Sequence, residues 1–158
     1  MTKKRFITND DIKNYCGALV QQMTIAGYRP GVIVAPVRGG LGIGVMLSHY
    51  FEVPMLALPL STRDYPNSDA YKRAEAVVAQ SLIMANDVLV VDDINDTGRT
   101  LQAIDAMYAK RELNHWVRYA VLLEKPSSKF SANFVAEEIH ADREQEWVVF
   151  PYEDWWCR

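Results

Sequence analysis

Apolar and polar residues follow two patterns along this chain. Four runs, apolar except for Arg118, are typical of strands buried on both faces of a sheet; they span residues 32–37, 55–60, 88–91 and 117–123. Four further segments carry apolar residues three or four positions apart, which predicts helices with one buried face; they span residues 8–27, 41–51, 69–85 and 101–113. This alternation predicts an α/β fold with a mostly parallel, twisted sheet and helices on both faces.

Short signals refine the two ends of the chain. Thr8 and Asp11 have the spacing of a capping box at the start of the first helix, and Gly27 is a suitable stop for it. Near the other end, Phe134-Val135 and Trp147–Phe150 predict short strands. We expect these two strands to lie in a separate C-terminal segment.

Composition narrows the class of protein. The chain has 158 residues, 49% of them hydrophobic, and a formal net charge of −3, which fits one globular domain. The mild acidity argues against nucleic acid as a partner, because a phosphate backbone favours a basic face. No apolar stretch has the length of a membrane span or follows the basic start as in a signal peptide. Cys16 and Cys157 form no metal-binding pair, so the reducing cytoplasm is the expected compartment.

Three polar clusters follow predicted strands. They are Arg38-Gly39-Gly40, the segment Asp92–Thr100, and Lys125. Ligands of open parallel sheets bind at the carboxyl ends of the strands, so these clusters are expected to meet at one site.

The segment Asp92–Thr100 combines groups for sugar, metal and phosphate. Free N–H groups and the positive dipole end at the start of the following helix suit a phosphate, and Gly98 lets the backbone approach it. Thr97 and Thr100 add hydroxyl donors, while Asp92 and Asp93 suit sugar hydroxyls or a divalent cation. The alternative is a plain turn with an aspartate as helix cap. The acidic pair directly upstream favours a binding site.

Residues 88–100, Val-Leu-Val-Val-Asp-Asp-Ile-Asn-Asp-Thr-Gly-Arg-Thr, resemble the phosphoribosyl pyrophosphate (PRPP) motif of the type I phosphoribosyltransferases. That motif is a hydrophobic strand, two acidic residues and Asp-Thr-Gly-x-Thr. The resemblance implies that Asp92 and Asp93 hold the ribose hydroxyls and Mg²⁺, with Asp93 the better metal ligand. It makes Asp96 the catalytic base near purine N7. The residues that would cradle the 5′-phosphate are Thr97, Gly98, Arg99 and Thr100.

The turn Val37-Arg38-Gly39-Gly40 resembles the pyrophosphate-binding loop of purine phosphoribosyltransferases. By this resemblance, Arg38 and the backbone of Gly39 would hold the pyrophosphate of PRPP. Members of the family often carry a non-proline cis peptide at this turn. We therefore predict a cis bond between Val37 and Arg38.

Two C-terminal features point to the acceptor. Lys125, which precedes a proline, resembles the lysine that donates to the purine 6-oxo group in hypoxanthine–guanine and xanthine–guanine enzymes. The segment Trp147–Glu153 resembles the base-clamping stretch of bacterial and archaeal 6-oxopurine enzymes, with Trp147 stacking on the purine and the backbone of Val148 binding its edge. The xanthine–guanine enzymes carry an acidic residue where this chain has Val149, so hypoxanthine and guanine are favoured over xanthine.

The resemblance implies a cytoplasmic, Mg²⁺-dependent enzyme of purine salvage. It would transfer the 5-phosphoribosyl group from PRPP to N9 of a 6-oxopurine, giving pyrophosphate and a nucleoside monophosphate, as a homodimer or homotetramer. We expect one domain over residues 1–158, with a core at about 28–125 and a hood at about 126–158 to which the N-terminus can contribute. Residues 61–67 match the position of the family's mobile loop, with Arg63 and Tyr65 as candidate contacts.

Two other functions remain open at this stage. A regulatory protein of the same fold could bind a nucleotide and RNA, although the acidic balance counts against it. A transferase could act on a pyrimidine base, although Lys125 and Trp147 favour a 6-oxopurine.

Overall fold

The fold is built on a five-stranded parallel sheet, in the computed structural model that describes residues 3–60 and 68–155. The strand order is β3-β2-β4-β5-β6, and every neighbouring pair is parallel. The strands are β2 (Val32–Pro36), β3 (Met55–Leu58), β4 (Val88–Asn95), β5 (Val117–Glu124) and β6 (Phe134–Glu138). Their carboxyl ends therefore lie at one edge, as the sequence predicts.

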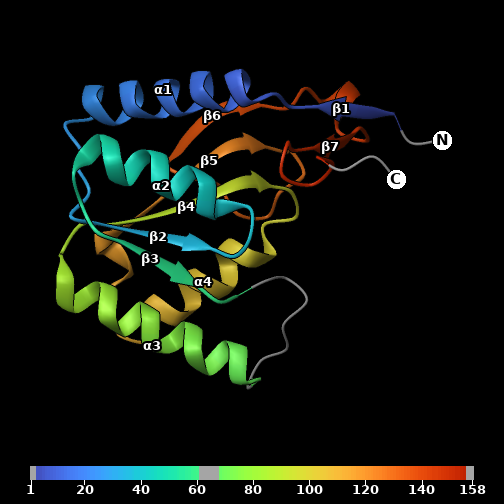
Figure 1. Ribbon diagram of the computed structural model, residues 1–158. Helices are drawn as coiled ribbons and strands as arrows, with labels where there is room; N and C mark the ends of the chain where they lie inside the picture. The colour runs from blue at the N-terminus through green and yellow to red at the C-terminus, as the bar shows by residue number, and fades with distance from the viewer. Residues whose placement is uncertain (1–2, 61–67, 156–158) are drawn as a thin grey trace.

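Helices cover both faces of this sheet (Figure 1). Helices α1 (Asn9–Ile25) and α2 (Gly40–Phe51) lie on one face, and α3 (Asp69–Met84) and α4 (Arg99–Ala109) on the other. Alternate residues of β2 divide between the two cores: Ile33 and Ala35 pack with α1 and α2, and Val32 and Val34 pack with α3 and α4. The predicted α/β fold with helices on both faces is confirmed.

The ends of α1 follow the predicted signals. The Thr8 backbone N–H donates to Asp11 Oδ2 at 2.8 Å, and the Asp11 N–H donates back to Thr8 Oγ1 at 3.1 Å, which completes the capping box. After the helix, Gly27 adopts a left-handed conformation with φ of 64°, which glycine adopts without a steric penalty. Both local predictions are confirmed.

Strand β6 corrects one expectation. Phe134-Val135 does not lie in a separate C-terminal segment, because β6 pairs with β5 as the edge strand of the main sheet. Gln22 of α1 covers the outer side of this edge: its Nε2 donates to the Val135 carbonyl at 2.7 Å, and its Oε1 accepts from the Val135 N–H at 3.2 Å. These bonds satisfy backbone groups that an edge strand would otherwise expose.

The two ends of the chain form a second sheet. Strands β1 (Lys4–Phe6) and β7 (Trp147–Val149) pair in parallel, so the N-terminus contributes a strand beside the C-terminal segment (Figure 1). Short 3₁₀ turns at Asn114–Trp116 and Ala141–Arg143 complete the described elements. Within residues 3–60 and 68–155, no helix is long and apolar enough to cross a membrane.

One ion-pair network joins the small sheet to the main one. Arg5 of β1 donates to both carboxylate oxygens of Glu137 of β6, at 2.6 and 2.8 Å, and the Tyr15 hydroxyl of α1 donates to the same carboxylate at 2.7 Å. The hydrogen bonds from Arg5 hold the pKa of Glu137 below its usual value. The network fixes β1 and β7 beside the carboxyl end of the sheet.

Candidate active site

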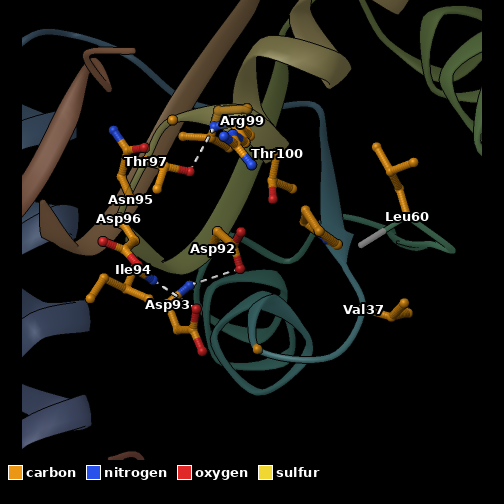
Figure 2. Close-up of a pocket in the computed structure, with 14 residues that line it drawn as sticks. Val37, Leu60, Asp92, Asp93, Ile94, Asn95, Asp96, Thr97, Arg99 and Thr100 are labelled. Carbon is orange, nitrogen blue, oxygen red and sulfur yellow. Dashed lines mark hydrogen bonds between the residues drawn. The ribbon is translucent and has the colours of Figure 1, made fainter. Parts of the chain in front are cut away.

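A cavity of about 400 Å³ lies where β2 and β4 end and where α2 and α4 begin (Figure 2). Figure 2 shows acidic side chains from the end of β4 and the turn into α4, with Val37 and Leu60 contributed after β2 and β3. Its lining residues are Pro36, Val37, Gly39, Leu60 and the whole of Asp92–Leu101. The first two polar clusters predicted from the sequence therefore meet in this cavity.

Two helix N-termini border the cavity. Helix α4 follows Gly98, which adopts φ of 83° and supplies no side-chain cap, and α2 follows Gly39, which also lacks one. Neither N-cap glycine can cap its helix with a side chain, and neither first turn carries an acidic residue. At α4, the Arg99 N–H donates to the Thr97 hydroxyl at 3.5 Å. Each end adds the positive pole of a helix dipole. The cavity can hold an anionic group at two places, one beside each helix.

A carboxylate pair lies between these helix ends. Asp92 Oδ1 accepts from the Asp93 N–H at 3.0 Å, and Asp93 Oδ1 accepts from the Ile94 N–H at 2.7 Å. Burial raises the pKa of both aspartates, and the neighbouring carboxylate raises that of Asp92 further. Charged carboxylates in this setting are stabilised by a bound cation.

The donor set fits Mg²⁺. Both carboxylates offer hard oxygen ligands, and no group of three acidic, histidine or cysteine side chains is gathered anywhere in the described part of the chain. A cation here would take its other ligands from water and substrate. This is how Mg²⁺ is usually held, by one or two carboxylates together with substrate phosphates and retained water.

Asp96 and Lys125 form an ion pair. Lys125 Nζ lies 2.7 Å from Asp96 Oδ1; the Lys125 side chain is 17% exposed and that of Asp96 54%. The Lys125 N–H also donates to the Asn95 carbonyl at 3.0 Å, which holds the residue at the strand end. The third predicted cluster, Lys125, thus reaches the second, Asp92–Thr100, through this pair.

A buried polar cluster supports the turn into α4. Asn95, which is 2% exposed, donates from Nδ2 to Glu124 Oε2 at 2.6 Å and to the Phe130 carbonyl at 2.5 Å. Ser128 Oγ donates to Asn95 Oδ1 at 2.9 Å. Gly98 packs against the same loop, since a Cβ there would lie 2.7 Å from the Phe130 nitrogen. The loop after β5 thereby fixes the backbone of the predicted phosphate site.

The C-terminal segment reaches the acidic pair through Tyr152. The Tyr152 hydroxyl donates a hydrogen bond to Asp93 Oδ2, and its ring stacks on Phe150 with centroids 5.4 Å apart. Burial, followed by the charge of Asp93, raises the pKa of Tyr152 well above its usual range, so the hydroxyl keeps its proton. This is a direct contact between the segment after β7 and the cavity.

Four predicted site residues lie outside the lining of the cavity described above: Arg38, Lys125, Trp147 and Val148. Arg38 is exposed beside Gly39, and the Val37–Arg38 peptide is cis, as predicted. Trp147 is 61% exposed at the start of β7, while Val148 packs against the core on the α1 side. Arg63 and Tyr65 lie outside the described residues.

The sequence patterns described above indicate no role for Asn95, Glu124 or Tyr152. Asn95 and Glu124 end adjacent strands and lie opposite each other in the register of β4 and β5. Two polar residues that end neighbouring buried strands are a signal that could have identified this pair. The contact of Tyr152 has no such local signal.

Fold and site together define a class of protein: a parallel α/β protein in which two helix N-termini and a carboxylate pair border one cavity. A profile of the phosphoribosyl transferase domain family matches residues 7–154, and the chain belongs to that family.

Individual relatives are distant. The chain is 23% identical to a xanthine-guanine phosphoribosyltransferase of Cereibacter sphaeroides over 123 residues, 77% of this chain and 68% of the relative. Among solved structures it is similar to a purine phosphoribosyltransferase from Pyrococcus horikoshii, with a TM-score of 0.70, 21% identity and coverage of 99% and 97% of the two chains. It is also similar to a xanthine-guanine-hypoxanthine phosphoribosyltransferase from Helicobacter pylori, with a TM-score of 0.71, 20% identity and coverage of 98% and 95%. These structures share its fold.

Proposed function

We propose that this protein transfers the 5-phosphoribosyl group of PRPP to N9 of a 6-oxopurine and releases pyrophosphate. The observation that carries the proposal is the pair of helix N-termini, each with a glycine at its N-cap, that border the cavity lined by Asp92 and Asp93. PRPP carries a phosphate at one end of its sugar and a pyrophosphate at the other. A cavity with two anion sites and a carboxylate pair between them matches that distribution of charge.

The donor side would work by charge stabilisation. The turn Thr97–Thr100 and the first N–H groups of α4 bind the 5′-phosphate, and Gly39 with the start of α2 binds the pyrophosphate. Arg38 is exposed next to that loop, where its guanidinium can close on the leaving pyrophosphate. Mg²⁺, held by Asp93 and Asp92, would neutralise charge that develops on the leaving group. These residues lower the barrier by stabilising charge in the transition state.

The acceptor side would use the Asp96–Lys125 ion pair. Lys125 donates to the 6-oxo group of the base, and Asp96 accepts the proton that the purine loses near N7. When the base binds, the two side chains would therefore exchange their contact with each other for contacts with two groups of the same purine. Trp147, which is 61% exposed, offers its indole face for stacking, and the Val148 backbone offers hydrogen bonds to the purine edge.

Hypoxanthine and guanine are the proposed acceptors. Val149 is apolar and 5% exposed, so this position offers no carboxylate to the 2-substituent of a purine. The names of the relatives from Cereibacter sphaeroides and Helicobacter pylori include xanthine, and we propose xanthine as a weaker acceptor. Purine acceptors in these names support a purine over a pyrimidine.

The proposal is tested with a panel of bases. The protein is incubated with PRPP, Mg²⁺ and hypoxanthine, guanine, xanthine, uracil or orotate in turn, and pyrophosphate release is followed. We expect release with hypoxanthine and guanine, weaker release with xanthine, and none with the pyrimidines. Release with orotate or uracil alone would support the pyrimidine alternative. RNA retention in a filter-binding assay, without transfer to any base, would support the regulatory one.

A further inference from the structure

The turn after β7 delivers a tyrosine hydroxyl to the donor site. Phe150, 2% exposed, anchors this turn in the core, and its backbone N–H donates to Glu153 Oε2 at 2.9 Å. The Glu153 N–H donates in return to the Phe150 carbonyl at 2.9 Å. Tyr152, between them, stacks on the Phe150 ring with an interplanar angle of 4°. The turn thus orients the ring before its hydroxyl reaches Asp93.

The carboxylate of Asp93 is held on several sides. Its Oδ1 accepts the Ile94 N–H, and its Oδ2 accepts the Tyr152 hydroxyl. Gly39 packs on the same carboxylate, so closely that a Cβ there would collide with it. A carboxylate has about four lone-pair positions, so two hydrogen bonds leave acceptor capacity for a ligand in the cavity that Asp93 lines.

We propose that Tyr152 is a positioning residue for Asp93, which it holds in the orientation that binds the divalent cation of the donor. This inference rests on the proposed function, because it assigns Asp93 to the metal. Outer-shell groups that hydrogen-bond a ligating carboxylate fix its orientation, and their loss typically costs about 10- to 100-fold in metal affinity or activity. Tyr152 lies in the C-terminal segment that also carries Trp147. The same segment would therefore support both the PRPP side and the purine side of the site.

The test compares Tyr152→Phe with the unchanged protein and with Tyr50→Phe. Phenylalanine keeps the ring that stacks on Phe150 and removes only the hydroxyl. Tyr50, 61% exposed on α2, is the matched control, because it lies outside the proposed machinery. Mn²⁺ alone is titrated into each protein, and the free ion is measured by electron paramagnetic resonance.

We expect Mn²⁺ to bind about tenfold or more weakly to Y152F than to the unchanged protein, with Y50F unaffected. The KM for PRPP should rise in Y152F at fixed Mg²⁺ and return toward normal at high Mg²⁺, while kcat at saturation changes little. An equal Mn²⁺ affinity in Y152F, or no Mn²⁺ binding to any of the proteins, would overturn the inference.

Failure of this inference is distinguishable from failure of the proposed function. If Y152F weakens Mn²⁺ binding but no base is converted, Tyr152 positions Asp93 and the proposed reaction is wrong. If bases are converted and Y152F binds Mn²⁺ normally, the reaction stands and Tyr152 has no such role.

Discussion

The aspartates at the cavity differ in their surroundings, in line with the different roles proposed for them. Asp92 and Asp93 are tied to backbone N–H groups at the end of β4, which suits fixed ligands for a sugar and a metal. Asp96 is more exposed and is paired with Lys125, which suits a group that must meet an incoming base. These different surroundings separate three aspartates that lie within five positions of the sequence.

Replacement of Asp96 by asparagine tests the acid–base assignment. D96N keeps a polar side chain of the same size beside Lys125 but removes the proton acceptor. We expect turnover to fall by about 10²- to 10⁴-fold, with the KM for PRPP nearly unchanged. Steady-state kinetics with hypoxanthine measures both, and Asp142→Asn, an exposed change on a 3₁₀ turn, is the control. Unchanged turnover in D96N would remove Asp96 from the catalytic role.

Glu137 makes a pH-dependent contribution to stability. Its pKa in the folded protein lies below the ordinary 4.5, because Arg5 and Tyr15 hydrogen-bond the charged form. The stabilisation is therefore fully present above pH 4.5 and is lost as the pH falls through the lower pKa of the folded state. Glu137→Gln should lower the unfolding free energy at pH 7 by roughly 1–2 kcal/mol, a figure reduced for partial exposure.

Urea unfolding at a series of pH values measures this effect. The difference between the unchanged protein and E137Q should shrink as the pH falls below 4.5. Glu138→Gln, at the exposed neighbouring position, is the control and should show little difference at any pH. A gap between E137Q and the unchanged protein that stays constant into strong acid would contradict the assignment.

At the scale of elements, the site depends on how closely α2 approaches β4. Gly39, just before α2, faces the Asp93 carboxylate, and any side chain there would displace it. The same helix contains Gly42, around which nothing lies within 4 Å of an added Cβ. The site therefore requires a glycine at position 39, just before α2, but not at position 42, within the helix.

Alanine substitutions at these two glycines give opposite expectations. Gly39→Ala should leave a folded protein with strongly weakened Mn²⁺ and PRPP binding, because Asp93 must move. Gly42→Ala should keep activity and raise the unfolding free energy by up to about 1 kcal/mol, the difference in helix propensity. Binding titrations together with thermal unfolding separate the two effects. Normal PRPP binding by G39A would show that the Asp93 orientation is unimportant.

Elements differ in how well the sequence predicts them. Strands β2, β4 and β5 are predictable because each is an apolar run buried between helices, and α1 carries its own start and stop signals. The apolar run at 55–60 predicts the strand β3, but the expectation that it is buried on both faces is wrong, because β3 is an edge strand with Ala57 exposed. For β6, the apolar pair Phe134-Val135 predicts a strand but not its place in the main sheet, because Ala136 and two glutamates continue it in the weak pattern of an edge strand. Gln22 hydrogen-bonds the backbone of Val135 on the outer side of β6. It lies 113 positions away in the sequence, so no local pattern predicts the contact.

At the scale of the whole molecule, strand topology explains why the cavity was predictable. Parallel strands bring their carboxyl ends together, so the clusters after β2, β4 and β5 had to converge. The supports of the site were less accessible, because they depend on register and on contacts across the chain. Asn95 meets Glu124 through the pairing of β4 with β5, and Tyr152 reaches Asp93 from 59 positions away.

Transfer of the phosphoribosyl group to a purine is tested most directly by identifying the product of the reaction. The protein is incubated with PRPP, Mg²⁺ and isotopically labelled hypoxanthine or guanine, and the mixture is analysed by mass spectrometry beside a D96N sample. Product analysis separates transfer to the base from simple hydrolysis of PRPP, which also releases pyrophosphate. We expect a labelled nucleoside 5′-monophosphate joined through N9, abundant with the unchanged protein and nearly absent with D96N. Hydrolysis of PRPP with no labelled nucleotide from hypoxanthine, guanine or xanthine would contradict this expectation.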